Sequence, residues 1–173
     1  MRLSAIEQGE LDGDNRVNIQ DVINQVMERF GRIAEKNEVR LSAMETKAAV
    51  FGNEVLLADM LGNLVDNAIK YNIPGGYVHI SVMEEGDEVL ISVSDNGAGI
   101  PKDMQSRLFE RFYRVDTSHS NKTASGSGLG LSIVKHIVQR HHGTIDVDSA
   151  PGRGTTITVH FLSADALGLP EDL

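Results

Sequence analysis

Four polar side chains on one predicted helix could take part in magnesium and phosphate chemistry. Asn63, Asn67, Lys70 and Tyr71 follow one another at intervals of four, three and one residues, and a helical period of 3.6 residues places them on one side of the helix. Amide oxygens can bind magnesium, and an ammonium group can contact a phosphate. Asparagine prefers caps and turns, so two of them inside a helix require some compensation. A solvated helix face is the alternative interpretation of this pattern taken alone.

An aspartate at the end of a predicted strand is followed by two glycines, within the segment Val93 to Ile100. The Asp95 carboxylate can accept a hydrogen bond from an exocyclic amine, and Gly97 and Gly99 allow a flat ring to approach the backbone closely. The alternative is a plain turn, because Asp-Asn-Gly is a common turn sequence.

A second glycine cluster, Ser125 to Leu131, leads directly into a predicted helix. Gly126, Gly128 and Gly130 leave backbone N–H groups that can surround a polyphosphate, and the helix N-terminus favours negative charge. A dinucleotide-binding motif would need a strand directly before the glycines, but a polar run precedes them here. A P-loop is excluded as well, because no Gly-Lys-Ser or Gly-Lys-Thr occurs in this cluster.

The segment Arg107 to Arg114 places three arginines beside three of the few aromatic residues of the chain. Arginine suits phosphate recognition, which makes Arg111 and Arg114 candidates for contact with a terminal phosphate. Exposed phenylalanines suit docking onto another surface, and Phe109 and Phe112 are the candidates for that role. A short amphipathic helix that packs both phenylalanines into the core of its own domain is the alternative.

Hydrophobic periodicity predicts the elements that carry these motifs. Helices are predicted at about Val22–Lys36, Asn53–Tyr71 and Leu129–Gln139, with Asn53 as an N-cap. Strands are predicted at Val17–Ile19, Val39–Met44, Ala48–Phe51, Tyr77–Glu84, Glu88–Ser94, Thr144–Val147 and Thr155–Phe161, the fourth and fifth of them forming a hairpin. The polar stretch within 101–127 is expected to include a mobile functional loop.

Composition restricts the class of protein. The 173 residues suit one domain of ordinary globular composition, with 40% hydrophobic and 24% charged residues. The formal net charge of -9, without any long run of Lys or Arg, argues against a nucleic-acid-binding surface. The chain has no cysteine, so thiolate chemistry and disulfides are excluded. No apolar stretch has the length of a membrane span, so we expect a cytoplasmic domain, although its parent could be a membrane sensor.

Taken together and in this order, the motifs resemble those of the ATP-binding domain shared by histidine kinases, DNA gyrase, the large heat-shock chaperones and MutL-type repair proteins, known as the Bergerat fold. The resemblance covers Val17 to Phe161. Its matching segments are Leu61 to Tyr71 (the N box), Asp95 to Ile100 (the first glycine box), Arg107 to Arg114 (the F box), Gly126 to Leu131 (the second glycine box) and Gly154 to Thr156 (the last glycine box). It implies an α+β fold, a two-layer α/β sandwich in which a mixed, mostly antiparallel sheet of about five strands packs against three helices, with a flexible ATP lid.

The resemblance also implies roles for individual residues. Asn67 would bind Mg2+, with Asn63 supporting the metal and phosphate region, Lys70 contacting the phosphates and Tyr71 the edge of the nucleotide. Asp95 would accept a hydrogen bond from the adenine amine, with Thr155 assisting through water. The positions implied to shape the adenine pocket and the lid are Gly97, Gly99, Ile100, Gly126, Gly128, Leu129, Gly130 and Leu131.

Position 63 distinguishes the branches of this superfamily. In the ATP-hydrolysing relatives a glutamate one helical turn before the magnesium-binding asparagine serves as general base, and Asn63 occupies that place here. An amide cannot take a proton from water at neutral pH. Together with the F box, this resemblance implies a sensor histidine kinase, in which ATP is held for transfer to another nucleophile.

The phosphate-accepting histidine of such kinases is followed by an acid and a proline, and no histidine of this chain has that setting. We therefore expect residues 1–14 to be the end of a dimerisation helix, 15–163 to be the catalytic domain and 164–173 to be a tail. The acceptor would lie on a separate dimerisation domain, contacted through Phe109 and Phe112, with a response regulator downstream. The piece itself would be monomeric and its parent homodimeric.

Three alternatives stay open at this stage. One is a gyrase-like or chaperone-like domain that hydrolyses ATP. Another is a regulatory binding module without nucleotide affinity, and the third is a serine kinase of the anti-sigma type, which would lack the helical segment Ser4 to Leu11.

Overall fold

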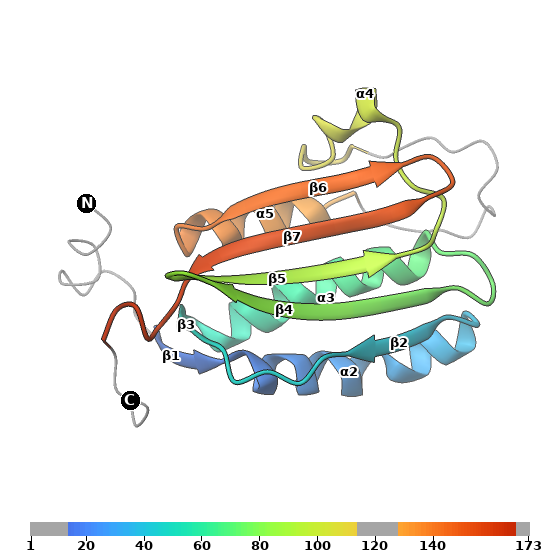
Figure 1. The fold of residues 1–173 in the computed structure, drawn as a ribbon. Coiled ribbons are helices and arrows are strands. Elements are labelled where there is room, and N and C mark those ends of the chain that lie inside the picture. Colours follow the sequence, from blue (N-terminus) through green and yellow to red (C-terminus); the bar gives the residue numbers. More distant parts are fainter. Residues whose placement is uncertain (1–13, 114–127, 169–173) are drawn as a thin grey trace.

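The protein forms two layers, with helices covering one face of a sheet (Figure 1). The computed structural model describes residues 14–113 and 128–168. The helices are α2 (Ile19–Lys36), α3 (Glu54–Lys70), α4 (Lys102–Gln105) and α5 (Gly130–Arg140). The strands are β1 (Asn15–Asn18), β2 (Arg40–Ala43), β3 (Ala49–Gly52), β4 (Tyr77–Glu85), β5 (Glu88–Asp95), β6 (Thr144–Ala150) and β7 (Gly154–Leu162).

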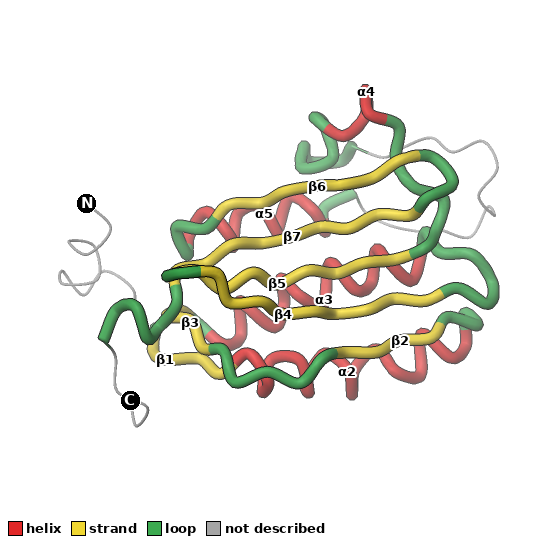
Figure 2. The backbone as a smooth tube through the Cα atoms, viewed as in Figure 1, coloured by secondary structure: helices red, strands yellow, loops and turns green. Residues whose placement is uncertain are grey.

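The main sheet has five strands in the order β2-β4-β5-β7-β6. Only the pair β2 and β4 is parallel, and the other pairs are antiparallel. Helices α2, α3 and α5 lie behind this sheet in Figure 1, and Figure 2 shows the same arrangement by element type. The predicted fold class is therefore confirmed, with β1 and β3 forming an additional two-stranded ladder.

Alternation along the central strands builds the core between the layers. Val89, Ile91 and Val93 of β5 are buried, because every second residue of a strand points to the same face. Helix α3 is buried along the stripe Leu57, Met60, Leu61, Leu64, Val65 and Ala68. Each large apolar side chain buried in this way contributes roughly 1.5–3 kcal/mol, so the helix layer is held firmly against the sheet.

The predicted N-cap of α3 is confirmed, since the Asn53 side chain accepts a hydrogen bond from the Leu56 N–H at 3.1 Å. The predicted hairpin is also confirmed, with Glu85 opposite Glu88 at its turn. Strand β6 runs to Ala150 and not to Val147 as predicted. The reason is that its last residues gain their strand conformation from pairing with β7 and not from an apolar pattern.

Some sequence predictions fall outside the described residues. These are the helical segment before residue 14, the polar stretch that was expected to form the ATP lid, and two candidate site residues, Arg114 and Gly126. Within the described part of the chain, every helix is too short or too polar to span a bilayer.

Candidate active site

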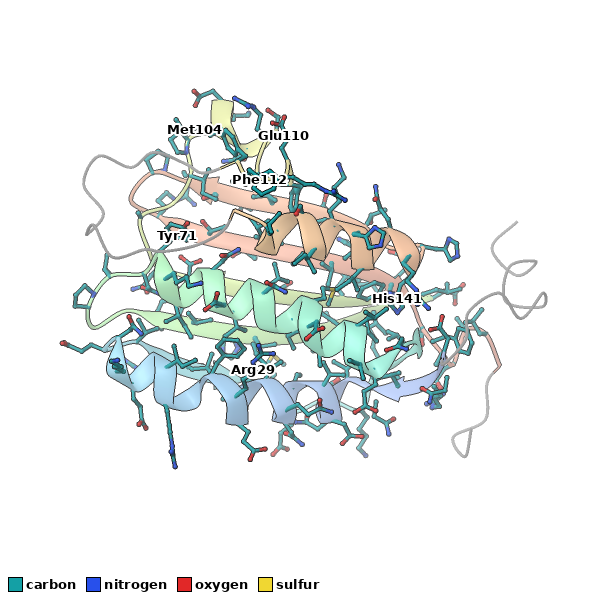
Figure 3. The ribbon with its side chains drawn as sticks, turned by 180° about the vertical axis from the view of Figure 1, so that it is seen from behind. Arg29, Tyr71, Met104, Glu110, Phe112 and His141 are labelled. Carbon is teal, nitrogen blue, oxygen red and sulfur yellow. The ribbon has the colours of Figure 1, made fainter. Side chains whose placement is uncertain are left out.

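The candidate residues gather at one end of the two layers. The C-terminal end of α3 and the N-terminal end of α5 meet there, next to the end of β5 and the start of β7 (Figure 3). Tyr71, labelled in Figure 3, lies directly after α3 at this end. Residues that are more than 30 positions apart in the sequence, such as Asn63 and Asp95, are therefore delivered to one region by separate elements.

The polar face of α3 meets the first residue of α5. A Cβ atom added at Gly130 would lie 3.1 Å from Asn63 Oδ1 and 3.8 Å from Asn67 Nδ2. The Asn63 Nδ2 group donates to the Asp59 carbonyl at 2.8 Å, which directs Oδ1 away from its own helix turn. The two amides thus stand beside a helix N-terminus, where the unpaired N–H groups favour an anion.

The amide of Asn67 is half-buried and, among the described residues, has no hydrogen-bond partner. A half-buried amide normally has a hydrogen-bond partner. Since the Asn67 amide has none among the described residues, its oxygen is available to a ligand. Lys70 lies one turn further along, at the exposed end of the helix, and its ammonium contacts the Asp66 carboxylate at 2.5 Å. The sequence motif did not reveal Asp66 as a neighbour of Lys70, and this carboxylate would compete with a phosphate for the ammonium.

Asp95 ends β5 and is partly buried. Its Oδ1 accepts a hydrogen bond from the Gly97 N–H at 2.8 Å. Burial raises the pKa of this carboxyl, while the backbone N–H groups of Gly97 and Thr155 act in the opposite direction. A partly buried carboxylate held by backbone donors can accept a further hydrogen bond from an amine in a place with little water.

Two glycines near Asp95 are required by close approach of other backbone segments. A Cβ at Gly97 would lie 2.4 Å from the Tyr71 carbonyl oxygen, which also accepts from the Ala98 N–H at 3.3 Å. Gly99 has a φ of 71°, and its Cβ would lie 1.9 Å from the Ala150 carbonyl oxygen. Any side chain at either position would push the wall of the site apart.

Asparagines missed by the sequence analysis hold this wall in place. The Asn72 Nδ2 group donates to the Ala68 and Tyr77 carbonyls at 3.1 and 2.9 Å, and its Oδ1 accepts from the Ile73 N–H at 2.8 Å. Asn96 Oδ1 accepts from the Tyr77 N–H at 2.7 Å. Asn72 follows the predicted helix and Asn96 lies in the Asp-Asn-Gly turn sequence, and neither position reveals what these side chains contact.

The segment after α4 is anchored by a leucine and not by its phenylalanines. Leu108 is 6% exposed, whereas Phe112 is 71% exposed and Phe109 is half-buried. The Phe112 N–H donates to the Gly128 carbonyl at 3.0 Å, so this segment touches the second glycine cluster. The interpretation that both phenylalanines pack into the core is therefore wrong for Phe112.

The remaining candidate residues differ in their exposure and in their contacts. Arg111 is exposed and, within the described residues, forms no ion pair with the site. The Ile100 N–H donates to Ser149 Oγ at 2.8 Å, and Thr155 Oγ1 lies 2.8 Å from the same oxygen. Leu129 precedes α5, and Leu131 packs against the core.

Comparisons with a family model and with curated proteins both indicate the same protein family. The model of the histidine kinase-, DNA gyrase B-, and HSP90-like ATPase family matches residues 52–165. Sensor-like histidine kinase SenX3 of Mycolicibacterium smegmatis is 39% identical over 161 residues, which cover 89% of this chain and 42% of that protein. The chain thus spans less than half the length of this curated relative.

Solved structures agree with this family. The mycobacterial sensor histidine kinase MprB superposes with a TM-score of 0.76 at 30% identity, covering 87% of this chain and 97% of that one. Full-length ShkA, solved in complex with AMPPNP, gives a TM-score of 0.76 at 26% identity, covering 90% of this chain and 32% of that one. The chain therefore belongs to the histidine kinase-, DNA gyrase B- and HSP90-like ATPase family, as an ATP-binding catalytic domain of the sensor histidine kinase type.

Proposed function

We propose that this domain positions Mg-ATP for transfer of the γ-phosphoryl group to a histidine on a separate dimerisation domain of its parent protein. The observation that carries this proposal is the position of the Asn63 amide beside Gly130, the first residue of α5. An amide stands where a water-activating base would be needed for hydrolysis, and it cannot act as one. Phosphoryl transfer depends mainly on positioning and charge neutralisation, which the site offers without a covalent residue.

The residues present fit a magnesium ion. The Asn67 amide lacks a partner within the described residues and lies beside Asn63 and Gly130, and magnesium accepts a single protein oxygen while keeping its other positions for water and phosphate. In this proposal Asn67 holds the ion, which neutralises phosphate charge, and Asn63 supports it. Lys70 exchanges Asp66 for a phosphate when nucleotide binds.

The base of the nucleotide is assigned to the strand side of the site. Asp95 accepts from the adenine amine, Thr155 assists it through water, and Tyr71 borders the nucleotide edge. Gly97, Gly99 and Ile100 form the wall of this pocket, and their tight backbone packing supports the assignment. Gly128, Leu129, Gly130 and Leu131 lie at the phosphate end, with Arg111 a candidate for the terminal phosphate.

The exposed ring of Phe112 and its neighbour Phe109 are assigned to the contact with the dimerisation domain. A response regulator then receives the phosphoryl group from the histidine. The division of the chain into a dimerisation-helix end (1–14), a catalytic domain (15–163) and a tail (164–173), a monomeric piece from a homodimeric parent, and a cytoplasmic location belong to the same proposal.

The experiment that tests this function mixes the domain with γ-labelled ATP, Mg2+ and a separately produced phosphoacceptor domain. We expect acid-labile, alkali-stable label on the acceptor domain, as phosphohistidine requires. A version of the acceptor domain with its histidine replaced by alanine is the control and should stay unlabelled. Rapid release of phosphate by the domain alone, without label on the acceptor, would instead support an ATP-hydrolysing domain. Absence of any ATP binding in a titration would support a regulatory binding module.

A further inference from the structure

Three polar residues form a row across the end of the sheet. Asp95 of β5 lies directly opposite Thr155 of β7, and Thr155 lies directly opposite Ser149 of β6. Directly opposite residues of antiparallel strands project to the same face. Two positions along each strand, Val93 is opposite Ile157, and both belong to the hydrophobic core. The row therefore lies on the helix-covered face, where the core ends and the site begins.

The hydrogen bonds of Ser149 fix the direction in which Thr155 donates. Ser149 Oγ receives the Ile100 N–H at 2.8 Å and lies 3.0 Å from the Gly154 carbonyl oxygen and 2.8 Å from Thr155 Oγ1. A hydroxyl has a single hydrogen to donate. Because a carbonyl oxygen can only accept, that hydrogen goes to Gly154, and Thr155 must donate its own hydrogen to Ser149.

This direction leaves Thr155 as an acceptor toward the site. Its hydroxyl hydrogen points to Ser149, so only lone pairs of Thr155 Oγ1 are available to a ligand or a bridging water. The neighbouring Asp95 is an acceptor as well while it is ionised. Asp95 and Thr155, which are adjacent in the row, can thus both accept a hydrogen bond from a donor on the ligand. A 6-amino purine supplies a donor at this edge, whereas a 6-oxo purine supplies an acceptor there.

We propose that Ser149 is a specificity-determining residue that acts through Thr155, orienting its hydroxyl so that the site selects adenine over 6-oxo purine nucleotides. The proposal rests on the proposed function, because it assumes that the base of a nucleotide meets Asp95. Ser149 does not touch the ligand in this proposal. Its effect is to prevent the Thr155 hydroxyl from rotating to donate toward the base, either directly or to the bridging water.

A purely structural role of Ser149 has to be separated from this one. Ser149 also accepts the Ile100 N–H, so its replacement by alanine weakens the pocket wall for every nucleotide. The ratio of two affinities cancels that common loss. We therefore choose as readout the ratio of the dissociation constants of inosine diphosphate and ADP, which differ in the 6-substituent and are not turned over.

The test measures this ratio by calorimetric titration with Mg2+. Ser149→Ala should lower the ratio by about threefold to tenfold, the worth of one hydrogen bond. Thr155→Val should lower it too, and the double variant should go no lower than Thr155→Val, since Ser149 acts through Thr155. Ser149→Thr keeps a hydroxyl and should keep the ratio. Figure 1 shows that β6, which carries Ser149, is the edge strand of the sheet.

A matched control exists on the same strands. Ser94 Oγ and Thr156 Oγ1 form a similar hydroxyl pair at 2.9 Å, one residue along from the row and hence on the other face of the sheet. Ser94→Ala should leave the ratio unchanged. An unchanged ratio in Ser149→Ala, or additive losses in the double variant, overturns the specificity role while leaving the proposed function intact. Failure of the unaltered chain to bind ADP overturns both.

Discussion

We expect a buried histidine at the far end of α5 to make the stability of this domain dependent on pH. His141 is 9% exposed. Its Nδ1 lies 2.7 Å from the Ile137 carbonyl oxygen, and its Nε2 lies 3.0 Å from the backbone nitrogen of Asn53. A carbonyl only accepts and a backbone N–H only donates, so the hydrogen is on Nδ1 and Nε2 carries a lone pair. This is the neutral form of the ring.

Protonation would place a second hydrogen against the Asn53 N–H. Burial accordingly lowers the pKa of His141, although the Ile137 carbonyl and the charge of Asp14 act in the opposite direction and Arg140 and His142 lower it further. Since the pKa is lower in the folded than in the unfolded state, the stabilisation is complete above the unfolded value of about 6.5 and is lost as the pH falls toward the folded value.

The size of the effect follows from the lost contact. Leaving one buried donor without its acceptor costs about 1–3 kcal/mol, which for a domain of this length lowers the unfolding temperature by about 2–4 °C per kcal/mol. We expect the free energy of unfolding to fall by this amount between pH 7.5 and a pH below the folded pKa. The substitution His141→Gln removes the titrating group and also the edge-to-face contact with Phe161, so it should destabilise the domain most at pH 7.5.

The assay is urea unfolding followed by circular dichroism at pH 7.5, 6.5 and 5.5. The difference in unfolding free energy between the unaltered domain and His141→Gln should shrink as the pH falls. His136→Gln, a change at an exposed histidine of the same helix, should keep the pH dependence of the unaltered domain. A constant difference for His141→Gln across this range would refute the assignment of the neutral buried ring.

Three further changes test the site itself. Asp95→Asn should lower ATP affinity by about tenfold to a hundredfold in a calorimetric titration, because a charged acceptor is lost; unchanged affinity would remove Asp95 from the adenine contact. Gly154→Ala, where φ is 80° and a Cβ would lie 1.9 Å from the Asp95 carbonyl oxygen, should cost several times the roughly 1 kcal/mol expected for Gly152→Ala, where φ is 74° and the space is open. Equal losses in urea unfolding would contradict the close approach. Asn67→Ala should abolish the gain in ATP affinity that Mg2+ gives over EDTA, and a gain that persists would rule out Asn67 as the ligand.

The fold could be predicted where local patterns and tertiary structure agree. The stripe of α3 and its Asn53 cap lie within one segment, so period and capping chemistry were enough. The end of β6 could not be predicted, because Asp148 and Ser149 are polar residues that pair with β7. Helix α4 is only four residues long, too short for a periodic pattern.

The site could be predicted only as far as its motifs are local. Asn63 and Asn67 share a face through helix geometry alone. Ser149 could not be identified, since its partner Ile100 is 49 residues away. Nor could the sequence show that Phe112, with a φ of 63°, occupies the left-handed region that such a bulky residue rarely adopts.

The helix layer and the sheet layer of the site differ in whether their polar side chains already have hydrogen-bond partners. Apolar packing sets the position of α5 against α3, as the buried Val134 and Ile137 indicate. The amide of Asn67 is therefore not needed to hold the helices together, and a ligand can bind it without breaking a bond within the described protein. On the strand side the opposite holds, because Ser149 and Thr155 are already bonded. Under the proposed function, the helix layer thus offers the unbonded Asn67 amide to the metal and phosphates, whereas the sheet layer offers hydroxyls of fixed direction to the base.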